Sequence, residues 1–199
     1  MKKLLISLIV SVGLISAAQA GDMVAGKAKA ATCGACHGAD GNSLAPNFPK
    51  IAGQGERYLV KQITDIKNGD RQVPEMMGFV MGLSETDIAD IAAFYASQTA
   101  GGGAADPALV EAGKLIFLGG NAATGVPACI ACHGAGGKGL AAAGFPSVAG
   151  QHATYTEKQL KDFYSAKRTN DASNVMRDIA SRMHMDEIKA VSSYIQGLK

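Results

Sequence analysis

The sequence predicts an all-α protein built from two tandem domains. Apolar residues recur at helical spacing, no segment carries a persuasive strand pattern, and the second half of the chain repeats the first. Residues 48–54, F-P-K-I-A-G-Q, return as F-P-S-V-A-G-Q at residues 145–151, an offset of 97. The same offset relates five further pairs: Tyr58/Tyr155, Lys61/Lys158, Gln62/Gln159, Asp65/Asp162 and Arg71/Arg168.

The composition narrows the class of protein. The 199 residues include 19 Lys and Arg against 17 Asp and Glu, and 47% of them are hydrophobic. This balance is typical of a globular chain and excludes an intrinsically disordered one. The formal charge of +2 comes without any block of basic residues, so we expect no nucleic-acid partner.

Residues 1–20 have the pattern of a cleaved secretory signal peptide. Lys2 and Lys3 precede an apolar run over residues 4–15, and Ala18-Gln19-Ala20 supplies the small residues of a cleavage site. We therefore expect cleavage after Ala20 and export of the mature chain. An uncleaved anchor is the alternative, but the apolar run is too short to span a bilayer comfortably.

The repeat also predicts where the domains divide. Residues 100–106 are rich in Gly and Ala and have no apolar pattern, which is typical of a linker. The domains are then residues 21–99 and 107–199. Each is small and poor in aromatic residues, so each needs more than its own side chains to build a stable core.

Helical spacing predicts a helix in four segments, residues 56–68, 84–98, 156–166 and 186–198. Ser84 followed by Asp87 predicts a capping box at the start of the second of these helices. Gly26 and Gly113 lie in the N-terminal helix expected in each half. A missing side chain at these two positions would let that helix cross a neighbour closely.

The four cysteines lie in two copies of the pattern C-x-x-C-H. Cys33, Cys36 and His37 form the first copy, and Cys129, Cys132 and His133 form the second. This is the attachment pattern of c-type haem. Two intervening residues let a helix-like turn present both sulfurs to the two vinyl groups on one porphyrin edge. The histidine that follows then offers its imidazole to the iron as the proximal ligand.

Three other interpretations of the cysteines remain open at this point. A thioredoxin-like redox pair also uses C-x-x-C, but it needs neither the histidine nor a second copy. A zinc site could draw on the cysteines and the two histidines. Two structural disulfides are the third alternative in an exported chain. The duplicated histidines favour two covalently bound haem c groups over all three.

The order of these motifs resembles a class I cytochrome c domain. Each half has A-G-K in an N-terminal helix, C-x-x-C-H, F-P-x-hydrophobic-A-G-Q, a middle helix, a methionine segment and an amphipathic C-terminal helix. Two such units in tandem, with N-F-P-K-I-A-G-Q-G-E-R-Y-L in the first and G-F-P-S-V-A-G-Q-H-A-T-Y in the second, resemble the dihaem cytochrome c4 family. The resemblance covers residues 21–199 and implies two tandem class I cytochrome c domains, each wrapped around a covalent haem.

The resemblance also implies a function. Members of this family are periplasmic electron carriers in respiratory chains, often loosely associated with the inner membrane. They take electrons from the cytochrome bc complex and pass them toward a haem-copper terminal oxidase. We therefore expect an electron-transfer protein, not an enzyme, with redox proteins as partners.

The same resemblance implies a role for two prolines. Pro49 follows His37 by 12 residues, and Pro146 follows His133 by 13. In class I cytochromes a proline at this place offers its carbonyl oxygen to the proximal histidine. Such a bond fixes the orientation of the ring and tunes its basicity.

The distal ligands are predicted from the duplication. In this region the offset between the halves is 100 residues, and Met76 and Met176 form the one pair with a methionine in both copies. The resemblance to cytochrome c4 points to the same two positions. Met77, next to Met76 in what we expect to be a flexible loop, is the competing candidate. Met81 and Met183 are expected to fill the core instead.

The two remaining histidines, His152 and His184, do not recur, so we predict surface positions for both. His184 corresponds to Ser84, the expected helix cap. Charge differs between the halves: residues 21–99 carry 7 basic and 9 acidic side chains, and residues 100–199 carry 10 and 8. This polarity could orient the molecule between an electron donor and an acceptor.

Two functional alternatives remain. A dihaem electron-accepting subunit of a periplasmic dehydrogenase, such as a flavocytochrome, would share the tandem architecture. A dihaem peroxidase-like enzyme would need one iron without a permanent sixth ligand, whereas both methionine segments are intact.

Overall fold

The computed structural model describes residues 21–199, and the predicted signal peptide lies outside them. The described chain is helical. Its only β pairing consists of two isolated bridges, Asn121 with Val126 and Leu140 with Phe145. The prediction of an all-α fold in two similar halves is confirmed. Within residues 21–199, no helix combines the length and the apolar character needed to cross a bilayer.

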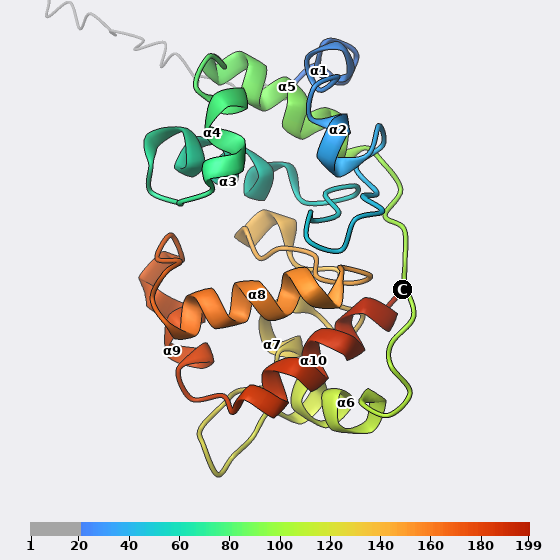
Figure 1. Ribbon diagram of the computed structural model, residues 1–199, viewed down its shortest axis with the longest axis vertical. Helices are drawn as coiled ribbons and strands as arrows, with labels where there is room; N and C mark the ends of the chain where they lie inside the picture. Colours follow the sequence, from blue (N-terminus) through green and yellow to red (C-terminus); the bar gives the residue numbers. More distant parts are fainter. Residues whose placement is uncertain (1–20) are drawn as a thin grey trace, which may run out of the picture.

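The first half contains five helices: α1 (Met23–Lys29), α2 (Gly34–His37), α3 (Glu56–Asn68), α4 (Pro74–Val80) and α5 (Glu85–Ala96). The second half repeats this order and adds two 3-10 turns: α6 (Val110–Gly119), α7 (Ile130–His133), η1 (Ala141–Ala143), α8 (Ala153–Tyr164), η2 (Ala172–Asn174), α9 (Val175–Ala180) and α10 (Met185–Gly197). The connection between α6 and α7 is longer than that between α1 and α2, and its residues 120–127 form the loop that projects at the lower end in Figure 1.

The first and last helices of each half cross closely at a glycine. A methyl group on Gly26 in α1 would lie 1.9 Å from the carbonyl oxygen of Asp90 in α5. A methyl group on Gly113 in α6 would lie 2.3 Å from the carbonyl oxygen of Ala190 in α10. Only a residue without a side chain fits at either crossing, as the sequence predicts.

The predicted helices are present with small shifts at their ends. The helix predicted over residues 56–68 matches α3, and the helix predicted over residues 156–166 begins three residues earlier, at Ala153. The capping box before α5 is present, because Ser84 Oγ accepts from the Asp87 N–H and the Asp87 carboxylate accepts from the Ser84 N–H. His184 takes the equivalent place before α10, where its N–H donates to Glu187 at 2.8 Å.

The structure corrects two expectations about the methionines. The segment around Met76 and Met77 is not a loop but the helix α4, which Pro74 begins at a position where no N–H donor is required. Met81 does not fill the core. It is 55% exposed at the C-terminal end of α4, because the preceding Val80 takes the inward position. Met183 is buried, as predicted.

Each half has its own apolar core, and each core reaches a motif cysteine. In the first half Leu59, Ile91, Phe94 and Tyr95 pack together, with Cys33 at the edge of the cluster. In the second half a cluster centred on Phe117, Ile188 and Val191 contacts Cys129. A group attached to these sulfurs would therefore lie against the core of its own half.

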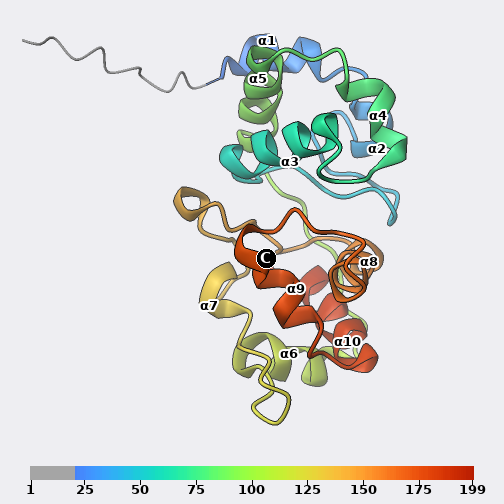
Figure 2. The same cartoon turned by 90° about the vertical axis from the view of Figure 1, so that its left-hand side faces the viewer.

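The two halves stack end to end, with α3 of the first facing α8 of the second (Figures 1 and 2). The segment that connects them runs along one side of the molecule (Figure 1). This connection is held at several points. The Gly101 N–H donates to Asn42 Oδ1 at 2.6 Å, and Lys50 Nζ donates to the carbonyl oxygen of Gly102 at 2.7 Å. Near its far end, the Gly103 N–H donates to the carbonyl oxygen of Gln196.

The glycine crossing yields a stability prediction. Gly113→Ala should lower the free energy of unfolding by about 1–3 kcal/mol, because the added methyl group must push α6 away from α10. The better helix propensity of alanine, about 1 kcal/mol, opposes this loss but does not cancel it. Denaturant unfolding followed by circular dichroism measures the change.

Gly119→Ala is the matched control, because Gly119 lies in the same helix and nothing stands within 4 Å of the added methyl group. This variant should be as stable as the unsubstituted protein or slightly more stable. Equal effects of the two substitutions would contradict the packing argument.

Candidate functional site

The two C-x-x-C-H motifs form short helical turns that present their three functional side chains together. Helix α2 runs from Gly34 to His37 with Cys33 at its N-cap, and α7 runs from Ile130 to His133 with Cys129 at its N-cap. Side chains three and four positions apart share one face of a helix. Both sulfurs and the imidazole of each motif therefore lie on the same face.

Each motif histidine is held by the predicted proline. His37 Nδ1 lies 2.9 Å from the carbonyl oxygen of Pro49, and His133 Nδ1 lies 2.9 Å from that of Pro146. Because a carbonyl oxygen only accepts, Nδ1 must carry the proton, which leaves a lone pair on Nε2. Burial lowers the pKa of both histidines, although the proline carbonyls oppose this. Both rings are therefore neutral and ready to bind a metal through Nε2.

The cysteines are available for covalent attachment. All four lie within the described residues, and their thiols are free there. Burial raises the pKa of Cys33, and it raises the pKa of Cys129 to about 11. The described residues also contain no cluster of three or more metal-binding side chains, as a zinc site would require.

The methionines lie on separate elements. Met76 is in α4, which packs on α3, and Met176 is in α9, which packs on α8. Both side chains are half-buried. The structure thus brings the cysteines, histidines and prolines of each half together, and it places the methionine of each half on a different helix, at equivalent points of the repeat.

A pair of buried arginines lies between the halves, and sequence reasoning missed its significance. Arg71 and Arg168 are each 9% exposed. Their guanidinium groups donate to glutamine and tyrosine oxygens from both halves: Arg71 to Gln62, Tyr155 and Gln159, and Arg168 to Gln159, Tyr58 and Gln62. All of these residues recur at the offset of 97, and that recurrence was the available sign of a shared role.

The arginine pair gives the interface positive charge, and within the described part of the chain no carboxylate pairs with either guanidinium. Burial alone would raise the pKa of Tyr58, but Arg168 and Arg71 outweigh burial and hold this pKa below its ordinary value. The buried hydroxyls of Tyr95 and Thr156 have no hydrogen-bond partner among residues 21–199. Buried positive charge and unpaired donors fit a group that carries carboxylates, as haem does. The residues present therefore fit haem in each half.

His152 is not the plain surface residue that we expected. It is half-buried at the N-cap of α8, and its Nε2 lies 2.8 Å from the carbonyl oxygen of Ser43 in the other half. His184 is exposed, as predicted. The expectation for His152 was wrong because its lack of a counterpart excludes a duplicated role but not a contact between the halves.

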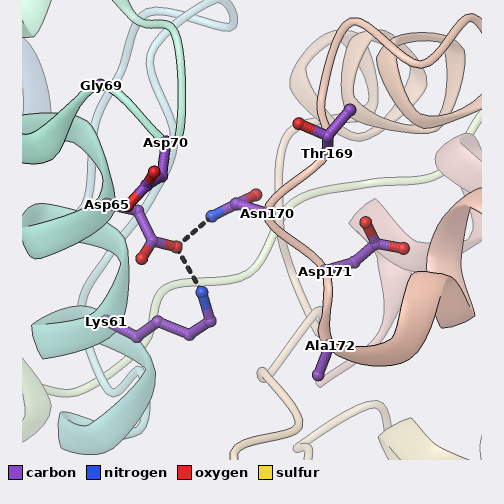
Figure 3. A pocket seen from close by; sticks show the side chains of 8 residues that line it. All are labelled: Lys61, Asp65, Gly69, Asp70, Thr169, Asn170, Asp171 and Ala172. Carbon is purple, nitrogen blue, oxygen red and sulfur yellow. Dashed lines mark hydrogen bonds and ion pairs between the residues drawn. The ribbon is translucent and has the colours of Figure 1, made fainter.

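A polar pocket of about 560 Å³ opens where the halves meet, and Figure 3 shows its lining. Asp65 of α3 accepts there from Asn170 of the second half at 2.6 Å and pairs with Lys61. The pocket contains none of the predicted haem-binding residues. It is the polar edge of the interface between the halves, and the C-x-x-C-H turns lie elsewhere.

Comparison with known proteins agrees with this geometry. The family model described as Cytochrome c matches residues 23–99 and again residues 110–199. Cytochrome c4 of Pseudomonas aeruginosa is 58% identical, with all of both chains covered. A crystal structure of reduced recombinant cytochrome c4 from Pseudomonas stutzeri superposes with a TM-score of 0.89 at 53% identity, covering 90% of this chain and all of that one.

A more distant relative is named for its role in electron transfer. The thiosulfate dehydrogenase electron acceptor of Stutzerimonas stutzeri is 36% identical, over 83% of this chain and 78% of that protein. The full-length matches remain those to cytochrome c4. They exclude the peroxidase-like alternative, because cytochrome c4 proteins transfer electrons and are not enzymes.

Two matched cytochrome c units, each with its own C-x-x-C-H turn, mean two covalent haem c groups, one on Cys33 and Cys36 and one on Cys129 and Cys132. The chain belongs to the cytochrome c4 family of dihaem electron-transfer proteins.

Proposed function

We propose that this protein carries electrons through the periplasm, from a cytochrome bc complex toward a haem-copper terminal oxidase. The observation that carries the proposal is the pair of equivalent sites, in which a neutral histidine, buried in the first half and half-buried in the second, stands beside two thiols and is held by a proline carbonyl. Bound haem supplies an iron that gains and loses one electron. The chain's own residues hold that iron, bury it and set its potential.

The ligand set belongs to the same proposal. His37 and Met76 are the axial ligands of the first haem, and His133 and Met176 are those of the second. Histidine and methionine together raise the haem potential and leave no open coordination position. A site of this kind passes electrons and does not bind small substrates.

The geometry of α4 and α9 supports Met76 over Met77. Successive side chains of a helix point about 100° apart, so Met76 and Met77, which are both half-buried, face different directions. The counterpart of Met77 is Arg177, which pairs with Asp171 at 2.7 Å. The position of Met77 is therefore filled in the other half by a polar, ion-paired side chain. Met76 corresponds to Met176, so a methionine fills that position in both halves.

Export and domain limits complete the proposal. A signal peptide is removed after Ala20, and residues 21–99 and 107–199 form the two haem domains joined by residues 100–106. The mature protein associates peripherally with the inner membrane. In this position it meets membrane-bound donors and acceptors from the periplasmic side.

A second candidate function is supported by the relative named as an electron acceptor of thiosulfate dehydrogenase. In this alternative the protein accepts electrons from a periplasmic dehydrogenase instead of the bc complex. The two hypotheses share the cofactors and ligands and differ in the donor.

The donor is tested by stopped-flow reduction of the purified oxidised protein. We expect fast reduction by bc complex and fast reoxidation by a haem-copper oxidase. Both rates should fall as ionic strength rises, because the 7 basic and 9 acidic side chains of residues 21–99 and the 10 and 8 of residues 100–199 offer each partner a different charge. Reduction by thiosulfate dehydrogenase but not by the bc complex would select the second candidate. Salt-independent rates would eliminate electrostatic steering.

The distal ligands are tested by substitution. Met76→Ala and Met176→Ala should each remove about half of the near-infrared sulfur-to-iron band of the oxidised protein, since thioether ligation produces it. Each should also lower the potential of one haem and let carbon monoxide bind it. Met77→Ala is the matched control and should leave the band unchanged. Loss of the band in Met77→Ala, with none in Met76→Ala, would show that the neighbouring methionine is the ligand.

A further inference from the structure

Two glutamines reach across the interface and bind the backbone of the opposite half in the same way. Gln54 Nε2 donates to the carbonyl oxygen of Ser147 at 2.9 Å, and Gln54 Oε1 accepts from the Ser147 N–H at 2.8 Å. Gln151 does the same to Lys50, at 2.8 Å and 2.9 Å. Each side chain thus pairs with both polar groups of one residue, 93 or 101 positions away in the sequence.

The two residues bound by the glutamines, Lys50 and Ser147, come immediately after Pro49 and Pro146 in the sequence. In the peptide group between Pro49 and Lys50, the carbonyl oxygen accepts from His37 Nδ1 and the N–H donates to Gln151 Oε1, both at 2.9 Å. The peptide between Pro146 and Ser147 joins His133 to Gln54 in the same manner. One peptide group therefore links the histidine of each half to a glutamine of the other half.

The orientation of the glutamine amides follows from their partners. Gln54 Oε1 also accepts from the N–H of Gly55, and Gln151 Oε1 from the N–H of His152, both at 3.0 Å. A flipped amide would place an NH2 group against two N–H donors, so this arrangement is excluded. Gln54 is 8% exposed, and its pairing is therefore little screened by water.

Hydrogen bonds that share a peptide group strengthen one another. An acceptor on the N–H draws electron density toward the carbonyl oxygen, which then accepts more strongly from its own donor. The donor here is the Nδ1–H of a motif histidine. A stronger bond at Nδ1 makes the imidazole more electron-donating at Nε2, and a more basic ligand stabilises the oxidised form of a metal centre.

We propose that Gln54 and Gln151 are positioning residues that act across the interface. Gln151 tunes the haem held by His37, and Gln54 tunes the haem held by His133. The inference rests on the proposed ligation by these two histidines. Each domain then completes the surroundings of the other domain's haem, and separation of the domains would change both potentials.

Gln54→Met and Gln151→Met test the proposal in the holoprotein, since methionine keeps the length of the side chain and removes the acceptor. The readouts are the NMR shift of each histidine Nδ1 proton in the reduced protein and the potential of each haem. Gln54→Met should weaken the bond at His133, moving its Nδ1 proton upfield, and raise the potential of the second haem only. Gln151→Met should do the same at His37 and the first haem.

Gln196→Met is the matched control. Gln196 also accepts from an N–H and donates to a carbonyl oxygen, those of Ala153 and Ala104, but neither peptide group touches a motif histidine. It should move neither Nδ1 proton. Equal movement of both Nδ1 protons in each glutamine variant, or no movement, would overturn the proposal. Gln54 and Gln151 would then only hold the two domains together.

Gln54→Glu provides a second test that does not depend on the methionine variant folding. The variant loses the Nε2 bond to the Ser147 carbonyl oxygen but keeps an acceptor for the Ser147 N–H. An ionised carboxylate is a stronger acceptor than an amide, so the His133 Nδ1 proton should move downfield, opposite to its movement in Gln54→Met. A movement in the same direction would contradict the proposal. The ligand assignment is checked in the unsubstituted protein, where an axial imidazole shows ring-current-shifted protons. Their absence for His37 or His133 would overturn the ligation separately from the coupling.

Discussion

The bond from each motif histidine to a proline carbonyl is the constraint on which the rest of the site depends. It fixes the tautomer, so that the lone pair available to a metal is on Nε2 and not on Nδ1. It also joins the C-x-x-C-H turn to the F-P loop, two segments that no helix connects directly. Because the same peptide group continues into the interface through its N–H, the constraint extends from one half of the molecule to the other.

The interface is polar because it must accommodate charge. Buried guanidinium groups are costly unless hydrogen bonds and opposite charge compensate them. Arg71 and Arg168 donate hydrogen bonds to glutamine and tyrosine oxygens of both halves. The carboxylates of the haem groups fit the remaining need. Each guanidinium group is bound by side chains of both halves, so neither half provides its surroundings alone.

Local features could be predicted from the sequence, and contacts between the halves could not. The cysteine motifs, the capping box at Ser84 and the glycine at position 113 depend on spacings of a few residues or on one helix pair that the repeat shows twice. The pairing of Gln54 with Ser147 spans 93 positions, and although both positions have counterparts in the repeat, recurrence alone does not say which residue a glutamine binds. His152 was misjudged for a different reason, since its contact with Ser43 has no counterpart in the repeat. The prediction that Met81 fills the core was wrong, because burial at the end of a short helix depends on where the helix stops.

The central claim is that a glutamine of each domain binds the peptide group that holds the motif histidine of the other domain. Hydrogen exchange of the Lys50 and Ser147 amides in the intact holoprotein tests it most directly. Both N–H groups should be strongly protected and should exchange at a common rate, because one opening of the interface frees both. Exchange of either amide at the rate of an unprotected surface amide would contradict the account.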